Sequence, residues 1–86
     1  MIDAATLEAI WLALGRQERQ IHETMQTLKA RGKQLRADGH QEAADQVADA
    51  VVALGLRMKQ VNVALSQVEP LYFAALRAGR RKRSEN

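Results

Sequence analysis

Residues 29–49 have the sequence KARGKQLRADGHQEAADQVAD, and the charges of this segment are mirrored about Asp38 and Gly39. Of the basic residues that precede this dipeptide, Lys29, Lys33 and Arg36 have acidic counterparts after it, which are Asp49, Asp45 and Glu42. Paired across the dipeptide (36 with 42, 33 with 45, 29 with 49), the residue numbers always add up to 78. Two antiparallel helices joined by a tight turn produce this relation. The segment therefore predicts a long α-helical hairpin.

Apolar residues on both sides of the turn have the spacing of helices that pack along one seam. Before the turn the stripe repeats every seven residues: Leu7, Leu14, Ile21, Leu28 and Leu35. After the turn the steps alternate between three and four residues: Ala44, Val47, Val51, Leu54, Met58, Val61, Leu65, Val68, Tyr72 and Ala75. In the hairpin we expect Leu28 to meet Val51, Ile21 to meet Met58 and Leu14 to meet Leu65.

Local signals mark the ends of both helices. Asp3 is a suitable N-cap for a helix over 4–37, because its carboxylate can accept a hydrogen bond from the first turn. Gly39 is suited to the left-handed conformation that often ends a helix. We therefore expect a turn over 38–40 and a second helix over 41–69.

Pro70 is the one break in the second helix. It cannot donate a hydrogen bond to the carbonyl of Ser66, and its ring crowds the preceding turn. The helix is expected to kink there, or to end and leave residues 70–80 as a short third helix. Because the apolar steps run through the proline, the kinked continuation is favoured. This divides the chain into a helical hairpin domain over 1–78 and a basic, solvated tail over 79–86.

Composition restricts the class of protein. Eighty-six residues allow one small domain, and 47% hydrophobic with 27% charged residues is the balance of a folded chain. The absence of cysteine excludes disulfides and thiolate metal sites and favours an intracellular protein. Asp3 and Glu8 stand where a signal peptide would be basic, and no apolar run is long enough to span a bilayer. We expect an all-α, cytoplasmic protein with no membrane segment and no cofactor.

A second apolar stripe lies on the later helix, on the side opposite the hairpin seam, and consists of Val52, Leu56 and Val63. Two helices cannot cover both faces, and burial of each such side chain contributes about 1.5–3 kcal/mol. The stripe therefore predicts association, most simply a homodimer that forms a four-helix bundle. The alternative is a third helix that folds back over the stripe within one chain.

The three aromatic residues are expected to gather at the end of the rod away from the turn, because Trp11 there approaches Tyr72 and Phe73. This group either plugs the open end of the core or anchors a partner protein, since aromatic residues are enriched at binding hot spots. Leu12 and Phe73 are the better candidates for exposure. Trp11, Leu12 and Phe73 thus join the second stripe as candidate interface residues.

The basic segment near the C-terminus contains five cations in seven residues: Arg77, Arg80, Arg81, Lys82 and Arg83. Residues 1–76 are almost neutral, with eight Lys and Arg against nine Asp and Glu. The segment could contact nucleic-acid phosphates or an acidic partner, or it could only make the chain more soluble. No aromatic residue is interleaved with it, so base recognition by stacking is not indicated.

The remaining polar residues show no catalytic or metal-binding pattern. His22 and His40 are far apart in the sequence and have no second ligand at helical spacing, so no metal site is expected. Asp45 and Asp49 share a helical face but are expected to lie beside lysines on an open surface. Acid–base catalysis therefore has no support, and we do not expect an enzyme or a small-molecule substrate.

Two functions fit these features. The first is a non-enzymatic helical interaction protein that binds another protein as an adaptor, assembly subunit or inhibitor. Its architecture is similar to that of short helical hairpins among plasmid- and phage-encoded proteins that regulate or block larger machines. The second is a nucleic-acid-associated helical dimer that contacts phosphates through its basic tail.

Overall fold

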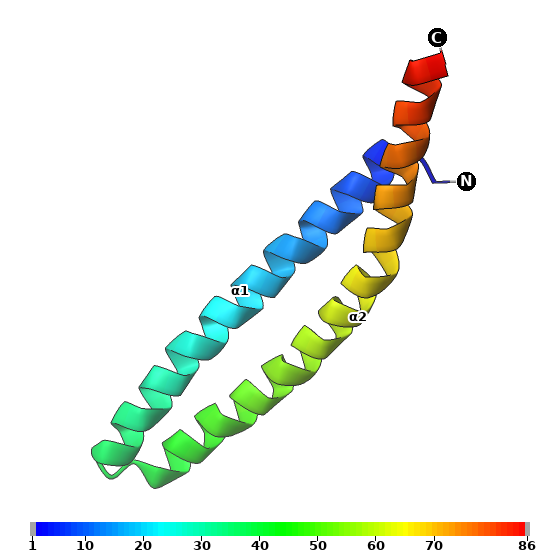
Figure 1. Cartoon of the computed structure of the whole chain (residues 1–86). Coiled ribbons are helices and arrows are strands. Elements are labelled where there is room, and N and C mark those ends of the chain that lie inside the picture. The colour runs from blue at the N-terminus through cyan, green and yellow to red at the C-terminus, as the bar shows by residue number, and fades with distance from the viewer. Residues whose placement is uncertain (1, 86) are drawn as a thin grey trace.

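The computed structural model describes residues 2–85, and the side chains of residues 2–79. It consists of two helices, α1 (Ala4–Ala37) and α2 (Gln41–Glu85), which lie antiparallel and form a hairpin (Figure 1). The molecule is a rod with extents of 69 × 16 × 13 Å. The described residues contain no strand. The prediction of an all-α helical hairpin is confirmed.

The first helix begins at the expected cap. Asp3 has an extended backbone, with φ −78° and ψ 166°, and its Oδ1 accepts a hydrogen bond from the backbone N–H of Thr6 at 3.0 Å. The carbonyl of Asp3 also accepts a bond from the N–H of Leu7 at 3.1 Å. The carboxylate of Asp3 therefore satisfies the N–H of Thr6, which has no carbonyl partner inside the helix.

The turn depends on one residue in the left-handed conformation, Gly39, which has a φ of +83°. Two backbone hydrogen bonds run back across it to α1. The N–H of His40 donates to the carbonyl of Leu35 at 2.8 Å, and the N–H of Gly39 donates to that of Arg36 at 3.2 Å. This pair of bonds is the Schellman motif, which terminates a helix and reverses the chain. The carbonyl of His40 then accepts from the N–H of Ala44 at 3.0 Å, so α2 begins at once.

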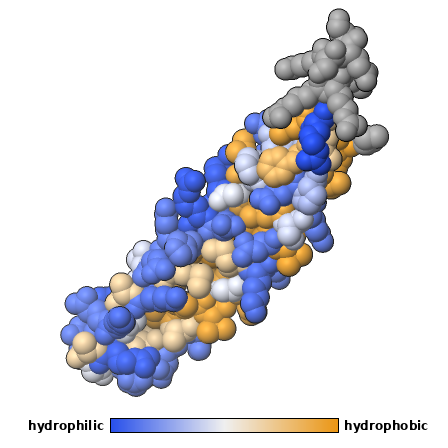
Figure 2. All heavy atoms as spheres, viewed as in Figure 1, coloured by the Kyte–Doolittle hydropathy of each residue, from blue (hydrophilic) through white to orange (hydrophobic). Residues whose placement is uncertain are grey.

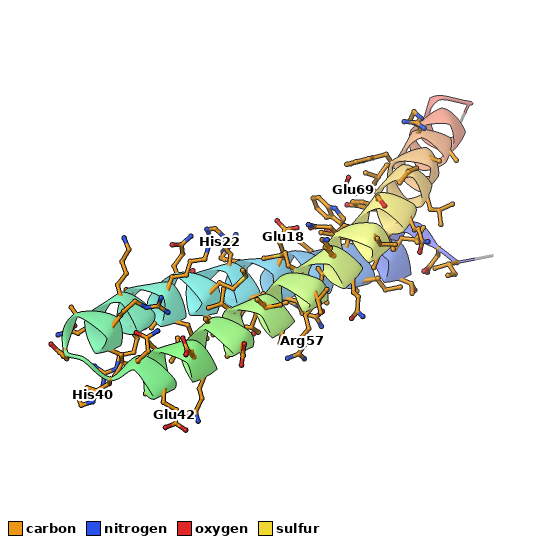
Figure 3. All side chains as sticks on the ribbon, turned by 90° about the horizontal axis from the view of Figure 1, so that it is seen from below. Glu18, His22, His40, Glu42, Arg57 and Glu69 are labelled. Atoms are coloured by element: carbon orange, nitrogen blue, oxygen red, sulfur yellow. The ribbon has the colours of Figure 1, made fainter. Side chains whose placement is uncertain are left out.

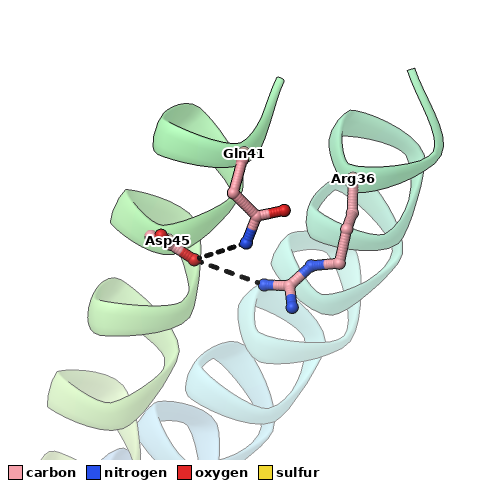
Figure 4. A network of polar contacts seen from close by, with 3 residues as sticks. All are labelled: Arg36, Gln41 and Asp45. Carbon is pink, nitrogen blue, oxygen red and sulfur yellow. Dashed lines mark hydrogen bonds and ion pairs between the residues drawn. The ribbon is translucent and has the colours of Figure 1, made fainter. Parts of the chain in front are cut away.

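The charges beside the turn pair differently from the mirror rule. Arg36 lies 3.5 Å from Asp45, to which Gln41 also donates a hydrogen bond at 3.2 Å (Figure 4). The predicted partner of Arg36, Glu42, points away from α1 (Figure 3). Among the described side chains no other ion pair forms, so the expected pairs of Lys33 with Asp45 and of Lys29 with Asp49 are wrong. Because both partners are largely exposed, this ion pair contributes little to stability.

The seam between the helices follows the expected register closely. A Cβ atom built on Gly32 would lie 3.4 Å from Cγ1 of Val47, so the two backbones approach closely there. Leu28 and Val51 line the same groove, as the apolar pairing predicts. Few side chains along the seam are buried, and they are Leu7, Ala44, Val61 and Tyr72. The core is thus a narrow strip with half-buried residues on either side of it.

Pro70 lies inside α2 and does not end it. Figure 1 shows that α2 changes direction where its colour passes from yellow to orange. The described residues therefore contain no separate third helix over 70–80, and none folds back over the second apolar stripe. The helical backbone extends to Glu85, beyond the expected start of the tail at residue 79. Arginine and lysine favour this continuation, because both are good helix formers and their charge suits the C-terminal end of the helix dipole.

The conformation of the turn leads to a paired prediction for two glycines. Gly39→Ala should destabilise the hairpin by about 1–2 kcal/mol, because a Cβ is unfavourable in the left-handed region. Gly15→Ala should instead stabilise it by about 0.5–1 kcal/mol, because no atom lies within 4 Å of the added Cβ and Gly15 is helical. Urea unfolding followed by circular dichroism measures both changes. Shifts of the same sign in the two variants would contradict this account of the turn.

Candidate functional site

The chain exposes far more surface than a compact protein of its mass. Its accessible area is 6788 Å², whereas a folded monomer of this mass exposes about 5,100 Å². Its radius of gyration is 19.5 Å, against about 12 Å for a compact domain of this length. Each helix has only one neighbour, so most of its circumference faces solvent. The candidate functional regions must therefore be sought on the open surface.

The second apolar stripe is exposed. Val52, Leu56 and Val63 retain 65%, 58% and 57% of their accessible surface, and together they form what we call the outer-edge patch. The prediction that these residues face away from the seam is confirmed. No other described residue covers them, since α1 lies on the opposite side of α2. The patch is a row of aliphatic side chains along one side of α2.

The aromatic residues gather at the end of the rod away from the turn. Ring centroids lie 5.4 Å apart for Trp11 and Tyr72, 6.1 Å for Trp11 and Phe73, and 5.5 Å for Tyr72 and Phe73. The Nε1–H of Trp11 donates to Oε1 of Glu69 at 3.1 Å, which joins the two helices. We call these three rings the open-end cluster. The expected approach of Trp11 to Tyr72 and Phe73 is confirmed.

The open-end cluster is partly core and partly surface. Tyr72 is buried, whereas its neighbour Phe73 is 42% exposed, and Leu12 is 45% exposed. Figure 2 shows hydrophobic side chains over this half of the rod, while the turn end is mainly hydrophilic. Ile2 and Leu71, which were not among the predicted interface residues, are also exposed. They border an apolar groove of about 330 Å³ with Leu7 and three alanines. The sequence does contain a signal for the exposure of Leu71. It lies next to the seam residue Tyr72 but does not belong to the three-and-four series of seam residues.

A second groove, of about 620 Å³, lies between the helices beside the turn. Its floor is apolar, and it includes Val47, which faces Gly32. Lys29, Lys33 and Arg36 line it as well, and within the described residues only Arg36 has a carboxylate partner. Asp45, the counterpart of Lys33 in the mirror of charges, pairs with Arg36 instead.

The basic segment lies largely outside the residues whose side chains are described. Arg77 is exposed on α2. The side chains of Arg80, Arg81, Lys82 and Arg83 lie outside the described part, although the backbone there is helical. What the structure adds is that this segment continues α2.

Within the described part of the chain, no three His, Cys, Asp or Glu side chains are grouped closely enough to hold a metal ion. His22 lies along α1 and His40 at the turn, well separated from each other (Figure 3). The helices between residues 2 and 85 include none with the length and apolar character needed to cross a membrane.

Comparisons with known proteins give no assignment: no protein-family model matches the chain, and no curated protein or solved structure is significantly similar to it. The function must therefore be argued from the two exposed apolar regions and the distribution of charge.

The environment of Tyr72, the single tyrosine, predicts how the hairpin responds to alkali. Burial raises the pKa of the Tyr72 phenol above 10.0, and the negative charge of Glu8 raises it further. The neutral phenol is thus favoured in the folded chain, and this stabilisation is complete below pH 10 and lost as pH rises through the folded pKa. We expect the tyrosinate absorbance of the folded protein to titrate with a midpoint above 10.0.

The Glu8→Gln variant should lower this midpoint, because it removes the neighbouring charge. Tyr72→Phe should reduce the loss of stability in alkali, because it has no phenol to ionise. Any loss of stability that this variant still shows is due to other groups that titrate in the same pH range, such as the lysines. A midpoint at or below the ordinary tyrosine value, or one insensitive to Glu8→Gln, would contradict the described packing of the open-end cluster.

Proposed function

We propose that this chain is a small non-enzymatic helical interaction protein that self-associates and binds another protein. The observation that supports this proposal is the exposure of large apolar side chains in two regions of a chain that fully buries very few residues. Contiguous apolar surface on a soluble protein typically marks an interaction site. The two regions are the outer-edge patch and the surface around the open-end cluster.

The outer-edge patch is the proposed surface for self-association. It is made of aliphatic residues at helical spacing, which is the composition of helix–helix contacts. A second helix that packs on Val52 and Leu56 would remove from water much of the surface that one hairpin cannot bury. Homodimerisation is the simplest association that does so.

The open-end cluster is the proposed surface for a different protein. Phe73 presents a half-exposed ring that is supported from behind by Trp11 and Tyr72. Rigid aromatic groups of this kind contribute disproportionately to binding, because they bring a large apolar area at a small cost in conformational entropy. Leu12 enlarges the apolar surface beside the ring. An adaptor, an assembly subunit or an inhibitor would each use such an anchor.

The test of this proposal is a capture experiment that compares matched variants of the open end. Phe73→Glu should abolish capture of the partner protein, because it places a charge in the centre of the binding surface. Gln26→Glu adds the same charge at an exposed residue of α1 that belongs to neither apolar region, and it should retain capture, as should the truncated chain 1–76. Trp11, the single tryptophan, should change its fluorescence when the partner binds.

Helicity measured by circular dichroism shows whether each variant is folded. A partner captured equally by Phe73→Glu and the unmodified chain would contradict the assignment of the open end. A partner lost on truncation to 1–76 would instead point to the basic segment.

The alternative function is contact with nucleic-acid phosphates through the basic segment. It is favoured by the distribution of charge, because residues 77–86 contain five basic residues and one acidic residue. The basic segment belongs to α2, whose backbone is helical through Glu85. Such binding would be independent of base sequence, since phosphates are the same along any nucleic acid.

Fluorescence anisotropy with mixed-sequence DNA and RNA distinguishes this alternative. If the segment contacts phosphates, the full chain should bind, with an affinity that falls steeply as salt is raised, and the chain 1–76 should not bind. The absence of binding by both forms would exclude the alternative. Equal binding by both would place the phosphate contact elsewhere on the hairpin.

A further inference from the structure

The direction of the outer-edge patch restricts the kind of dimer that the chain can form. At about 100° per residue, Val52 and Leu56 each lie roughly 160° around α2 from the seam residue Leu54. The exposure of Val52 and Leu56 agrees with this position, since α1 covers neither of them. In a closed four-helix bundle, by contrast, each helix contacts two neighbours in directions nearly at right angles. The patch and the seam of α2 therefore do not have the geometry of a closed bundle.

The residues beside the patch carry charges that distinguish parallel from antiparallel docking. Asp49 and Lys59 continue the same stripe on either side of Val52 and Leu56, with successive steps of three, four and three residues. Both are exposed, and neither has an ion-pair partner among the described side chains. In a parallel pair of α2 helices Asp49 would face Asp49, and Lys59 would face Lys59. In an antiparallel pair about a two-fold axis near residue 54, Asp49 faces Lys59 of the second copy at both ends.

The same antiparallel register brings two of the three patch residues, Val52 and Leu56, together. Reflection about residue 54 places Val52 of one copy opposite Leu56 of the other. Val52 and Leu56 of the two copies then form a small core of four aliphatic side chains. At each end of this core an Asp49 faces a Lys59. Opposite charges that face each other also set the register of helix pairs.

We propose that a second copy of this chain docks antiparallel along the outer edge of α2 and forms a single layer of four helices, in which each α2 lies between its own α1 and the α2 of the other copy. This inference rests on the proposed function of the outer-edge patch as an association surface. The chain exposes about 1,700 Å² more than a compact monomer of its mass, and a stable dimer of standard size buries about 800 Å² per copy. The excess area is therefore sufficient for this dimer and for a further partner at the open end.

The first part of the test is the mass of the full chain and its charge variants, measured by analytical ultracentrifugation. The unmodified chain should sediment as a dimer. Asp49→Lys and Lys59→Asp should each weaken the dimer about tenfold, because each creates two like-charge pairs by symmetry. The double variant Asp49→Lys/Lys59→Asp should recover the dimer to within about twofold, because it restores opposite charges at both positions.

The second part uses the absence of cysteine from the chain, which makes introduced thiols unique. Under oxidation, a mixture of Asp49→Cys and Lys59→Cys chains should form a covalent dimer. Neither variant alone should do so, because like residues lie about 15 Å apart along the axis of the antiparallel pair. Helicity of each variant confirms that it is folded.

The outcomes distinguish a failure of the antiparallel layer from a failure of the proposed self-association. A monomer at all concentrations would overturn both the dimer and the association role of the outer-edge patch. A dimer in which Asp49→Cys cross-links to itself would overturn the antiparallel layer and leave the association surface in place. A dimer that neither single charge reversal weakens would place the contact away from the outer edge of α2 and overturn the antiparallel layer.

Discussion

The hydrogen bonds that Gly39 and His40 make back to α1 set how the two helices face each other. Both helices are stiff, so the register established at the turn is carried along their whole length. It places Gly32 against Val47 near the turn and Trp11 beside Glu69 at the far end. One additional residue in the turn would rotate α2 by about 100° and move its apolar stripe out of the seam. The short connection therefore controls contacts tens of ångströms away.

A helix with one neighbour can bury one stripe of its surface, and α2 has two apolar stripes. The first packs against α1 with residues such as Val61, and the second contains Val52 and Leu56 and remains exposed. The apolar surface of α2 is therefore larger than one hairpin can bury, and this excess is the physical basis of the proposed association. It also separates the outer-edge patch from the seam, because the two lie on opposite sides of the same helix.

The open end combines a structural weakness with the surface proposed to bind a partner. Pro70 removes a backbone hydrogen bond from α2, which would cost about 3 kcal/mol in an isolated helix. The bond from Trp11 to Glu69 just before the proline, and the contact between Trp11 and Tyr72 just after it, hold this part of α2 against α1. The packing thus stabilises the helix through the proline. It leaves Phe73 on the surface, where the ring is available to a partner.

Helical periodicity and turn chemistry are local properties, so the hairpin, the left-handed Gly39, the seam and the exposure of Val52 and Leu56 could all be predicted from the amino-acid sequence. The mirror of charges predicted the antiparallel arrangement correctly and failed in detail. Arg36 pairs with Asp45 because the position of each carboxylate around α2, and not its distance along the chain, decides which one a long side chain can reach.

Tertiary packing alone decided whether α2 continues through Pro70 and which of its aromatic residues is buried. Whether Pro70 ends a helix depends on the contacts that its neighbours make with α1, and these outweigh the local cost of the proline. Tyr72 and Phe73 are adjacent and similar in size, yet one is buried and the other is half exposed. Their sequence was enough to place them at the open end of the rod. Which ring enters the seam depends on how α2 is rotated against Trp11, and only the folded pair of helices sets that rotation.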